Sequence, residues 1–318
     1  MRVSAVVLLA LLLNIAASRS SAGQTMNTGD PVKRGLSERD FPRARQLTPG
    51  VYSYEALRAG DPGGKMTTVS LIVITNDGVL VADGQGNAEQ TKEMVDWIAK
   101  TTTQPIKYVV ICSDHGDHTG GNVSFPAGVR YIIHPTSKAI LDRSANAPSE
   151  ARRDGGWKLP ADAELVADKK TITMGGEEIQ ILFLGRSHTG GDLAVYLPRL
   201  KILFLSEIYL NRVFPAMRSA YPSEWLKALD RAEAMQADIY IAGHGFTEQG
   251  PVSREEIHAY HRALSAVIAE ATRLHDAGMP VDEAIAQAHW GEYASWTLAS
   301  SQGPIAIRKV YEELNGKR

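Results

Sequence analysis

Two histidines and an aspartate stand close together in the first half of the chain. They lie within residues 113–118 (SDHGDH), between the apolar run 108–111 and a glycine-rich stretch. Imidazole is a favoured zinc ligand and carboxylate suits harder divalent cations, so the mixed cluster of His115, Asp117 and His118 indicates a metal site. Zinc is the first candidate for this site, and iron and manganese are the alternatives.

Three further potential ligands follow apolar segments later in the chain. They are His188 after residues 179–184, Glu207 after residues 201–205, and His244 after residues 237–242. In sheets covered by helices, ligand sites gather beyond the carboxyl ends of the strands. The four segments are therefore expected to bring their polar side chains to one shared metal centre.

The order and spacing of these motifs resemble the metallo-β-lactamase superfamily over about residues 47–250. The resemblance implies an α/β fold, a four-layer αββα sandwich with a C-terminal helical extension. It also implies a dinuclear metal site in the cleft between the two sheets, holding one or two zinc ions per chain.

Individual roles follow from the same resemblance. The matching metal ligands are His115 and His188 for the first position, and Asp117, His118 and His244 for the second. Glu207 stands where the family usually has a metal-bridging aspartate. Asp83 matches an aspartate that supports the metal loop from outside the ligand shell, where such partners fix the orientation of ligating rings.

Two residues depart from the family pattern. Ser113 replaces the first histidine of the motif, and a hydroxyl is a poor zinc ligand beside imidazole. The first metal position is therefore expected to be weak, to be completed by water or to recruit Asp114. Glu207 keeps the charge of the usual aspartate with a longer reach, which could compensate for the missing histidine.

The resemblance favours a metal-dependent hydrolase in which a metal-activated water attacks an ester, thioester, lactone, amide or β-lactam bond. Asp117 is expected to orient this water and carry a proton, which makes it the candidate catalytic residue. A β-lactamase proper is not favoured, because Thr119 stands where one subgroup has histidine and Glu207 where another has cysteine. Arg212 could hold an anionic substrate, although a surface role is the simpler interpretation.

Two other classes of function stay open. The first is a di-iron oxidoreductase, since the carboxylate of Glu207 suits iron better than a cysteine would. The second is a non-catalytic periplasmic protein that binds a metal or a ligand at a site partly decayed at Ser113. The retention of five other ligands argues against complete decay.

The N-terminal residues predict export. Within residues 1–22, a basic start and an apolar run precede small residues, as in a secretory signal peptide, and the run is short for a transmembrane helix. Residues 23–46 are polar and predict a flexible arm. The protein is therefore expected to be periplasmic or secreted, without a membrane anchor after cleavage; an uncleaved anchor is the alternative.

The rest of the chain divides into a metallo-β-lactamase-like domain, residues 47–250, and a helical region, residues 251–318. A hairpin is expected over 68–82, and helices over 87–100, 253–277, 281–288 and 305–314. The helical region could pack on the sandwich, cover the cleft or form a homodimer. Residues 144–160 predict a loop at the site entrance, with Trp157 available for packing or substrate contact.

Composition narrows the choice of partners. The chain has 318 residues, of which 44% are hydrophobic and 22% charged, as in ordinary globular proteins. Its net charge of −2 gives no reason to expect nucleic acid or an anionic membrane as a partner, so a small-molecule substrate is expected. The single cysteine, Cys112, excludes an intrachain disulfide.

Overall fold

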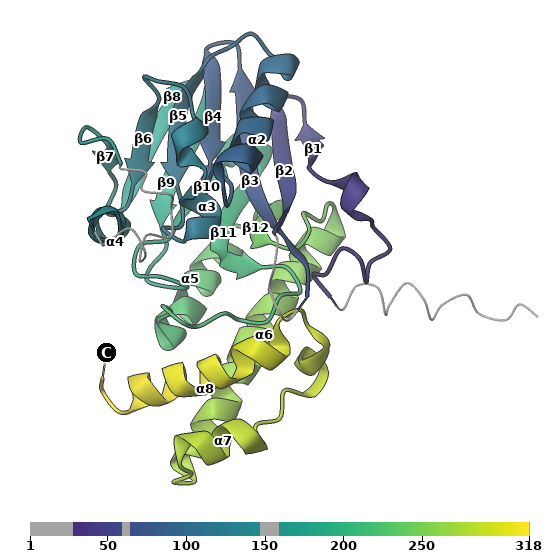
Figure 1. Ribbon diagram of the computed structural model, residues 1–318, viewed down its shortest axis with the longest axis vertical. Coiled ribbons are helices and arrows are strands. Elements are labelled where there is room, and N and C mark those ends of the chain that lie inside the picture. Colours follow the sequence, from purple (N-terminus) through teal and green to yellow (C-terminus); the bar gives the residue numbers. More distant parts are fainter. Residues whose placement is uncertain (1–27, 59–63, 147–158, 318) are drawn as a thin grey trace, which may run out of the picture.

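The computed structural model describes residues 28–58, 64–146 and 159–317. Within these ranges one curled 12-stranded sheet runs in the order β7-β6-β5-β4-β3-β12-β11-β10-β9-β8, and β2 joins β1 to β3 beside this path (Figure 1). The strands are β1 Arg43–Thr48, β2 Val51–Arg58, β3 Met66–Thr75, β4 Gly78–Ala82, β5 Ile106–Ile111, β6 Arg130–Ile133, β7 Glu164–Leu165, β8 Lys169–Met174, β9 Glu177–Phe183, β10 Leu193–Leu197, β11 Ile202–Leu210 and β12 Ile239–His244.

Helices lie on both outer faces of the curled sheet (Figure 1). The α-helices are α2 Ala88–Thr101, α3 Gly116–Thr119, α4 Pro135–Ala145, α5 Pro222–Ala234, α6 Pro251–Asp276, α7 Val281–Gln287 and α8 Ala299–Leu314. Short 3₁₀ turns are η1 Glu38–Asp40, η2 Asn122–Ser124, η4 Pro198–Leu200 and η5 Gly291–Ser295.

Three hydrophobic clusters define four layers. The inner cluster joins β1–β7 to β8–β12, with Leu71 and Phe204 among its buried members. The second cluster packs Met94 of α2 and Leu141 of α4 on the outer face of the first half of the sheet. The third cluster packs α5, α6 and α8 on the second half. The predicted αββα sandwich with a C-terminal helical region is therefore confirmed.

The two halves of the sheet also meet by hydrogen bonding. β12 pairs antiparallel with β3 at a single register position, His244 opposite Thr68. This junction matters because His244 is the last residue of β12 and one of the expected ligands. The site therefore lies where the two half-sheets come together.

Local sequence accounts for the elements that support the site. The β3–β4 hairpin turns at Asn76 and Asp77, and Gly78 has φ 143°, which few other residues adopt. Asn87 caps α2, where its side chain accepts a hydrogen bond from the backbone N–H of Gln90 at 2.9 Å. Both features agree with the sequence prediction.

The described part of the predicted arm, residues 28–46, differs from a free segment. Thr28 and Asp30 are buried, and the Thr28 hydroxyl lies 2.8 Å from that of Thr297. β1 begins at Arg43 and pairs with β2. The polar composition misled the prediction, because these side chains find hydrogen-bond partners: Thr28 pairs with Thr297, and the Asp30 carboxylate accepts from the backbone N–H groups of Val32 and Lys65.

The C-terminal helices pack on the second half of the sheet. α6 buries Ile257, Leu264 and Val267 against it, and α8 begins at Ala299 rather than near residue 305. In the described ranges, none of the helices is long and apolar enough to span a membrane. The predicted signal peptide and Trp157 lie outside the described residues.

Candidate metal centre

The loop after β5 presents three expected ligands. His115 immediately precedes α3, and Asp117 and His118 lie within its one short turn. The turn is closed by hydrogen bonds from the backbone N–H groups of His118 and Thr119 to the His115 carbonyl. Three ligands within four residues are thereby held in one compact, hydrogen-bonded unit.

Asp83 holds this loop from behind. Its Oδ1 accepts hydrogen bonds from the backbone N–H of Cys112 at 2.7 Å and of Ser113 at 3.3 Å. Its Oδ2 accepts a hydrogen bond from the Ser206 hydroxyl and lies 3.0 Å from Nδ1 of His118. Asp83 has φ 62°, a conformation that is costly for a non-glycine residue and persists only where neighbours enforce it.

Glu207 lies inside a strand, not beyond the end of one. β11 continues to Leu210, and its pairing with β12 shifts register on both sides of Ser206, which has φ 48°. The expectation that the strand ends before Glu207 is therefore wrong. Such irregularities re-aim side chains, and this one accompanies a Glu207 carboxylate directed into the site.

The first donor group consists of His115, His188 and Glu207, whose ligand atoms lie within 4.8 Å of one another. Oε2 of Glu207 is 2.8 Å from Nδ1 of His115 and 3.2 Å from Nε2 of His188. The Ser113 hydroxyl donates to the same Oε2 at 2.7 Å. Ser113 thus contacts the shared carboxylate, while Asp114 belongs to neither donor group found among the described residues.

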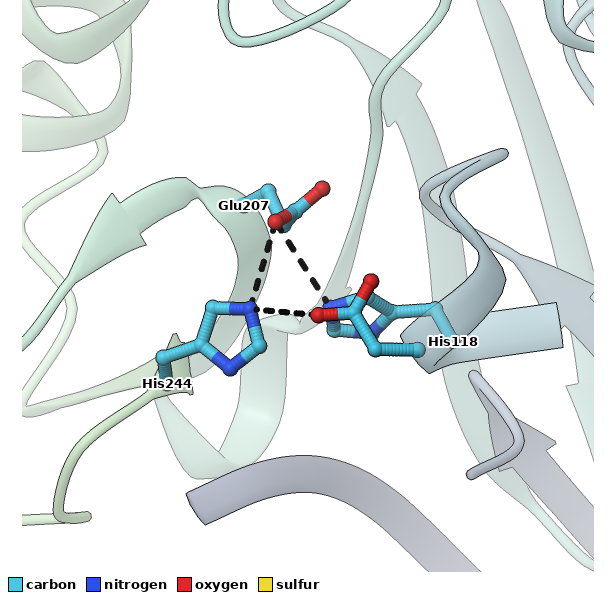
Figure 2. A group of neighbouring side chains, drawn as sticks. His118, Glu207 and His244 are labelled. Carbon is cyan, nitrogen blue, oxygen red and sulfur yellow. Dashed lines mark hydrogen bonds and ion pairs between the residues drawn. The ribbon is translucent and has the colours of Figure 1, made fainter. Parts of the chain in front are cut away.

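The second donor group consists of Asp117, His118, Glu207 and His244, again within 4.8 Å. Nε2 of His244 lies 3.2 Å from both Oδ2 of Asp117 and Oε1 of Glu207. Nε2 of His118 is 3.9 Å from Oε1 of Glu207. Figure 2 shows the rings of His118 and His244 turned toward the Glu207 carboxylate.

Outer partners face the far ring nitrogens of both histidines of the second group. Nδ1 of His244 lies 2.7 Å from the carbonyl oxygen of Thr67, and Nδ1 of His118 faces Asp83. Each Nε2 is therefore the nitrogen left to face the centre. His188 of the first group differs, because its Nδ1 is buried without a hydrogen-bond partner and its ring packs edge-on against Trp225 at 5.3 Å.

Neighbouring carboxylates raise the pKa of three histidines, His115, His118 and His244, against the effect of burial. Burial alone would lower the pKa of His115, but the adjacent Glu207 and nearby acids outweigh burial and raise it to about 10. For His244, hydrogen bonds with Asp117 and Glu207 likewise overcome burial and raise the pKa to about 9. Burial lowers the pKa of His188 to about 3, so this ring is neutral at pH 7.

The two central acids are held ionised. Burial alone would raise the pKa of Asp117, but the hydrogen bond from His244 and the neighbouring histidines hold it well below its ordinary value. The surrounding histidines, with hydrogen bonds from His115 and His244, do the same for the pKa of Glu207 against the effect of burial. Both acids are therefore anionic at neutral pH.

These donors fit divalent metal ions. Imidazole and carboxylate groups converge from four segments of the chain, and Nε2 of His118 is buried without a hydrogen bond. A buried nitrogen of this kind is costly unless it has a partner, and a metal ion would supply one. The structure thus brings together all six residues that the sequence proposed as ligands, with Asp83 and Ser113 directly against them.

A cavity of about 810 Å³ opens over the donors. His115, Asp117, His188, Glu207 and His244 line its inner end. Its outer walls carry residues that the sequence reading did not select, among them Arg58, Arg143, Arg218 and Gln302. They come from separate segments of the chain and no motif contains them, so no sequence signal could have grouped them.

Arg212 has neither of the roles considered for it. Its guanidinium makes two short contacts with Glu256 of α6, at 2.6 and 2.7 Å, and lies over the ring of Trp296. Glu256 also accepts a hydrogen bond from Asn211 at 3.0 Å. Arg212 is partly buried and ties the end of β11 to the C-terminal helices.

The fold and the donor arrangement together define the class of protein. The family model of the metallo-beta-lactamase superfamily matches residues 62–244, and the chain belongs to this superfamily. Members of the superfamily are generally hydrolases and typically bind metal ions.

The similar proteins carry several different activities in their names. The chain is 23% identical to the 2,4-dinitroanisole O-demethylase subunit alpha of a Nocardioides species, over 83% of this chain and 79% of that one. It is 24% identical to a type 2 metallo-beta-lactamase of Bacteroides fragilis, over 63% and 78%. It is 22% identical to a linear primary-alkylsulfatase of a Pseudomonas species, over 74% of this chain and 53% of that protein.

Solved structures share the fold at low identity. A metallo-beta-lactamase from Pontibacter korlensis matches with a TM-score of 0.60 at 21% identity, covering 69% of this chain and 98% of that one. A variant of a sec-alkylsulfatase matches with a TM-score of 0.66 at 19% identity, covering 88% of this chain and 51% of that one. The chain thus spans about half the length of the alkylsulfatases that it resembles.

Proposed function

We propose that the protein is a metal-dependent hydrolase of small molecules that cleaves an ester-type bond. The observation that carries this proposal is the convergence of two donor groups on one carboxylate, Glu207, at the inner end of a substrate-sized cavity. A divalent ion bound there would supply the chemistry of activating water at neutral pH and polarising the bond to be cleaved. Zinc suits the mixture of imidazole and carboxylate donors best.

Asp117 is the residue that would orient the attacking water. Its carboxylate lines the cavity and stays anionic at neutral pH, so it can accept a hydrogen bond from water and take up a proton transiently. Arg58 supports this role, because its Nη1 lies 2.6 Å from Oδ2 of Asp117. The contact fixes the carboxylate in one orientation and offsets its charge.

The choice of an ester-type bond rests on the donors and the relatives together. Glu207 stands in place of the cysteine found in one β-lactamase subgroup, which argues against a β-lactam substrate. The likeness to alkylsulfatase structures extends over more of this chain than the likeness to β-lactamases, 88% against 69%.

We also retain export as part of the proposal, on the evidence of the N-terminal sequence.

Hydrolysis of 4-nitrophenyl acetate by the purified, metal-loaded protein tests this function. Chelation and the substitution Asp117→Ala should each lower turnover at least about 100-fold, since general-base and nucleophile-orienting groups contribute factors of this size. His258→Ala provides a matched control, because His258 is exposed on α6 and pairs with Glu233. Turnover that survives chelation unchanged would contradict a metal-dependent hydrolase.

A further inference from the structure

The cavity that contains the metal centre is lined by both acids and arginines. The acids that line it, Asp114, Asp117 and Glu207, are buried or nearly so and gather at the metal centre. Three arginines line it as well: Arg58 at the end of β2, Arg143 on α4 and Arg218 between β11 and α5. Cationic groups from three separate segments therefore line the cavity that contains the centre.

The three arginines differ in whether they form an ion pair with an acidic side chain. Nη1 of Arg58 lies 2.6 Å from Oδ2 of Asp117, so the charge of Arg58 is paired with an acid of the metal centre. Arg143 and Arg218 are exposed, and neither forms an ion pair within residues 28–58, 64–146 and 159–317. Arginines elsewhere commonly have a carboxylate partner in this protein, as Arg186 does with Glu224.

The same cavity has an apolar wall. Its apolar members come from both halves of the sandwich and from the C-terminal region, and they are Met66, Ile140, Leu141, Leu210, Val213, Ala216 and Leu298. Gln302 of α8 lies beside them and offers an amide. A ligand that fills this space must present an apolar body to the wall and can place a polar group near the arginines.

We propose that Arg143 and Arg218, which line the same cavity, bind a negatively charged oxyanion group that the substrate carries away from the bond that is cleaved. The substrate class is then a small amphiphilic organic anion with a carboxylate or sulfonate at one end, an apolar body and an ester-type bond at the metal centre. Arginine suits this role because its planar guanidinium matches carboxylate and sulfonate oxygens with paired hydrogen bonds. This inference rests on the proposed hydrolytic function for its catalytic part only.

Two esters with the same leaving group test the subsite by catalysis. Mono(4-nitrophenyl) adipate carries a carboxylate at the far end of a six-carbon acyl chain, and 4-nitrophenyl hexanoate lacks it. The wild type should favour the adipate by about 10- to 100-fold in kcat/KM, the range expected for one or two charge-assisted hydrogen bonds. The double variant Arg143→Gln/Arg218→Gln should bring the ratio of the two kcat/KM values to about 1.

A matched control separates charge at the subsite from overall charge. Arg262→Gln removes an exposed arginine on α6 that does not line the cavity, and it should keep the preference for the adipate. An equal preference in the wild type and the double variant, or a wild type that favours the neutral ester, would overturn the proposal.

Binding without turnover distinguishes failure of the subsite from failure of the proposed function. Calorimetry with hexane-1-sulfonate, hexanoate and hexan-1-ol should show binding of the two anions, weakened at least about tenfold by the double variant, and little binding of the alcohol. Tighter binding of hexane-1-sulfonate or of the free hexanoate anion shows whether the subsite prefers a sulfonate or a carboxylate. Anion binding that the double variant leaves unchanged would place the anion at the metal centre and refute the subsite, even if neither ester is hydrolysed.

Discussion

The two donor groups share Glu207 but differ in the number of donors and in how firmly neighbouring groups fix the histidine rings. The second group has four donors; Nδ1 of His244 pairs with the Thr67 carbonyl, and Nδ1 of His118 lies 3.0 Å from the Asp83 carboxylate. The first group has three donors, and Nδ1 of His188 has no hydrogen-bond partner. The side chain of His115 is 27% exposed, against 0% for that of His118.

This difference teaches that the substitution at Ser113 weakens one position without dismantling the centre. A histidine at residue 113 would give the first group a fourth donor. The serine hydroxyl instead donates a hydrogen bond to Oε2 of Glu207. Fewer and less fixed donors bind a metal ion less tightly. We therefore expect one tight position at Asp117, His118, Glu207 and His244, and one weaker position at His115, His188 and Glu207.

Glu207→Ala should have the largest effect. It removes a donor from both groups at once and leaves the protonated rings of His115 and His244 without their central partner. Turnover is expected to fall at least about 1000-fold, with metal lost from both positions, because the loss exceeds that of a single outer partner. Steady-state kinetics and metal analysis measure both. Glu207→Asp is the control and should retain metal at one position or both.

His118→Ala and His115→Ala should separate the groups. The first substitution should weaken the tight position about 100-fold, and the second should leave it within about threefold while abolishing the weak one. Competition with a chromogenic chelator measures both affinities. Equal effects of the two substitutions on metal affinity at the tight position would contradict the assignment of His115 and His118 to different positions.

Asp83→Asn should lower affinity at the tight position by about 10- to 100-fold, the usual cost of removing an outer partner. The amide keeps the size of the side chain but removes the charge that faces Nδ1 of His118. Affinity at the weak position should change less, since Asp83 touches neither of its histidines. Circular dichroism provides the check that the fold survives, because Asp83 also holds the backbone of Cys112 and Ser113.

Metal affinity should rise with pH in the neutral range at both positions. His115 and His244 have pKa values raised to about 10 and about 9, so at pH 7 each must lose a proton before its nitrogen can bind a metal ion. The first group should therefore release about one proton and gain about tenfold in affinity per pH unit. The second should release at least one and gain at least as much, because the pKa of His118 is raised as well. Calorimetry in buffers of different ionisation enthalpy counts these protons. Affinity that is flat between pH 6.5 and pH 7.5, which spans about one such tenfold step, would contradict this assignment.

Ser113→His should have the smallest effect on function and should make the two groups more alike. A fourth donor is expected to strengthen the weak position by about tenfold, the low end of what a single interaction with a ligand shell contributes. The tight position should be unchanged. An affinity at the weak position that does not move would show that Ser113 is not the cause of its weakness.

The sequence predicted the ligands well because their signal is local. Residues 113–118 place His115, Asp117 and His118 in one turn, while His188 follows the apolar strand β9 and His244 ends β12. Glu207 was identified from its position in the chain, but the irregularity in β11 at Ser206 depends on pairing with β12 and could not be predicted from local composition.

Features that depend on contacts between distant parts of the chain could not be predicted from the sequence. The cavity draws Arg58, Arg143, Arg218 and Gln302 from four elements that no sequence period connects. The polar segment that includes Thr28 was predicted to be free, yet it is buried against residues near 297. Arg212 gave no sign of its partner Glu256, which lies 44 positions away.

The central claim is that one tight and one weaker metal position share Glu207. Elemental analysis of the purified protein after titration with zinc, combined with calorimetry, tests it most directly. The account predicts two zinc ions per chain at saturation, bound in two resolved steps, with only the tighter ion surviving extensive dialysis. Two ions bound with equal affinity, or a single step that saturates at one ion, would contradict the account.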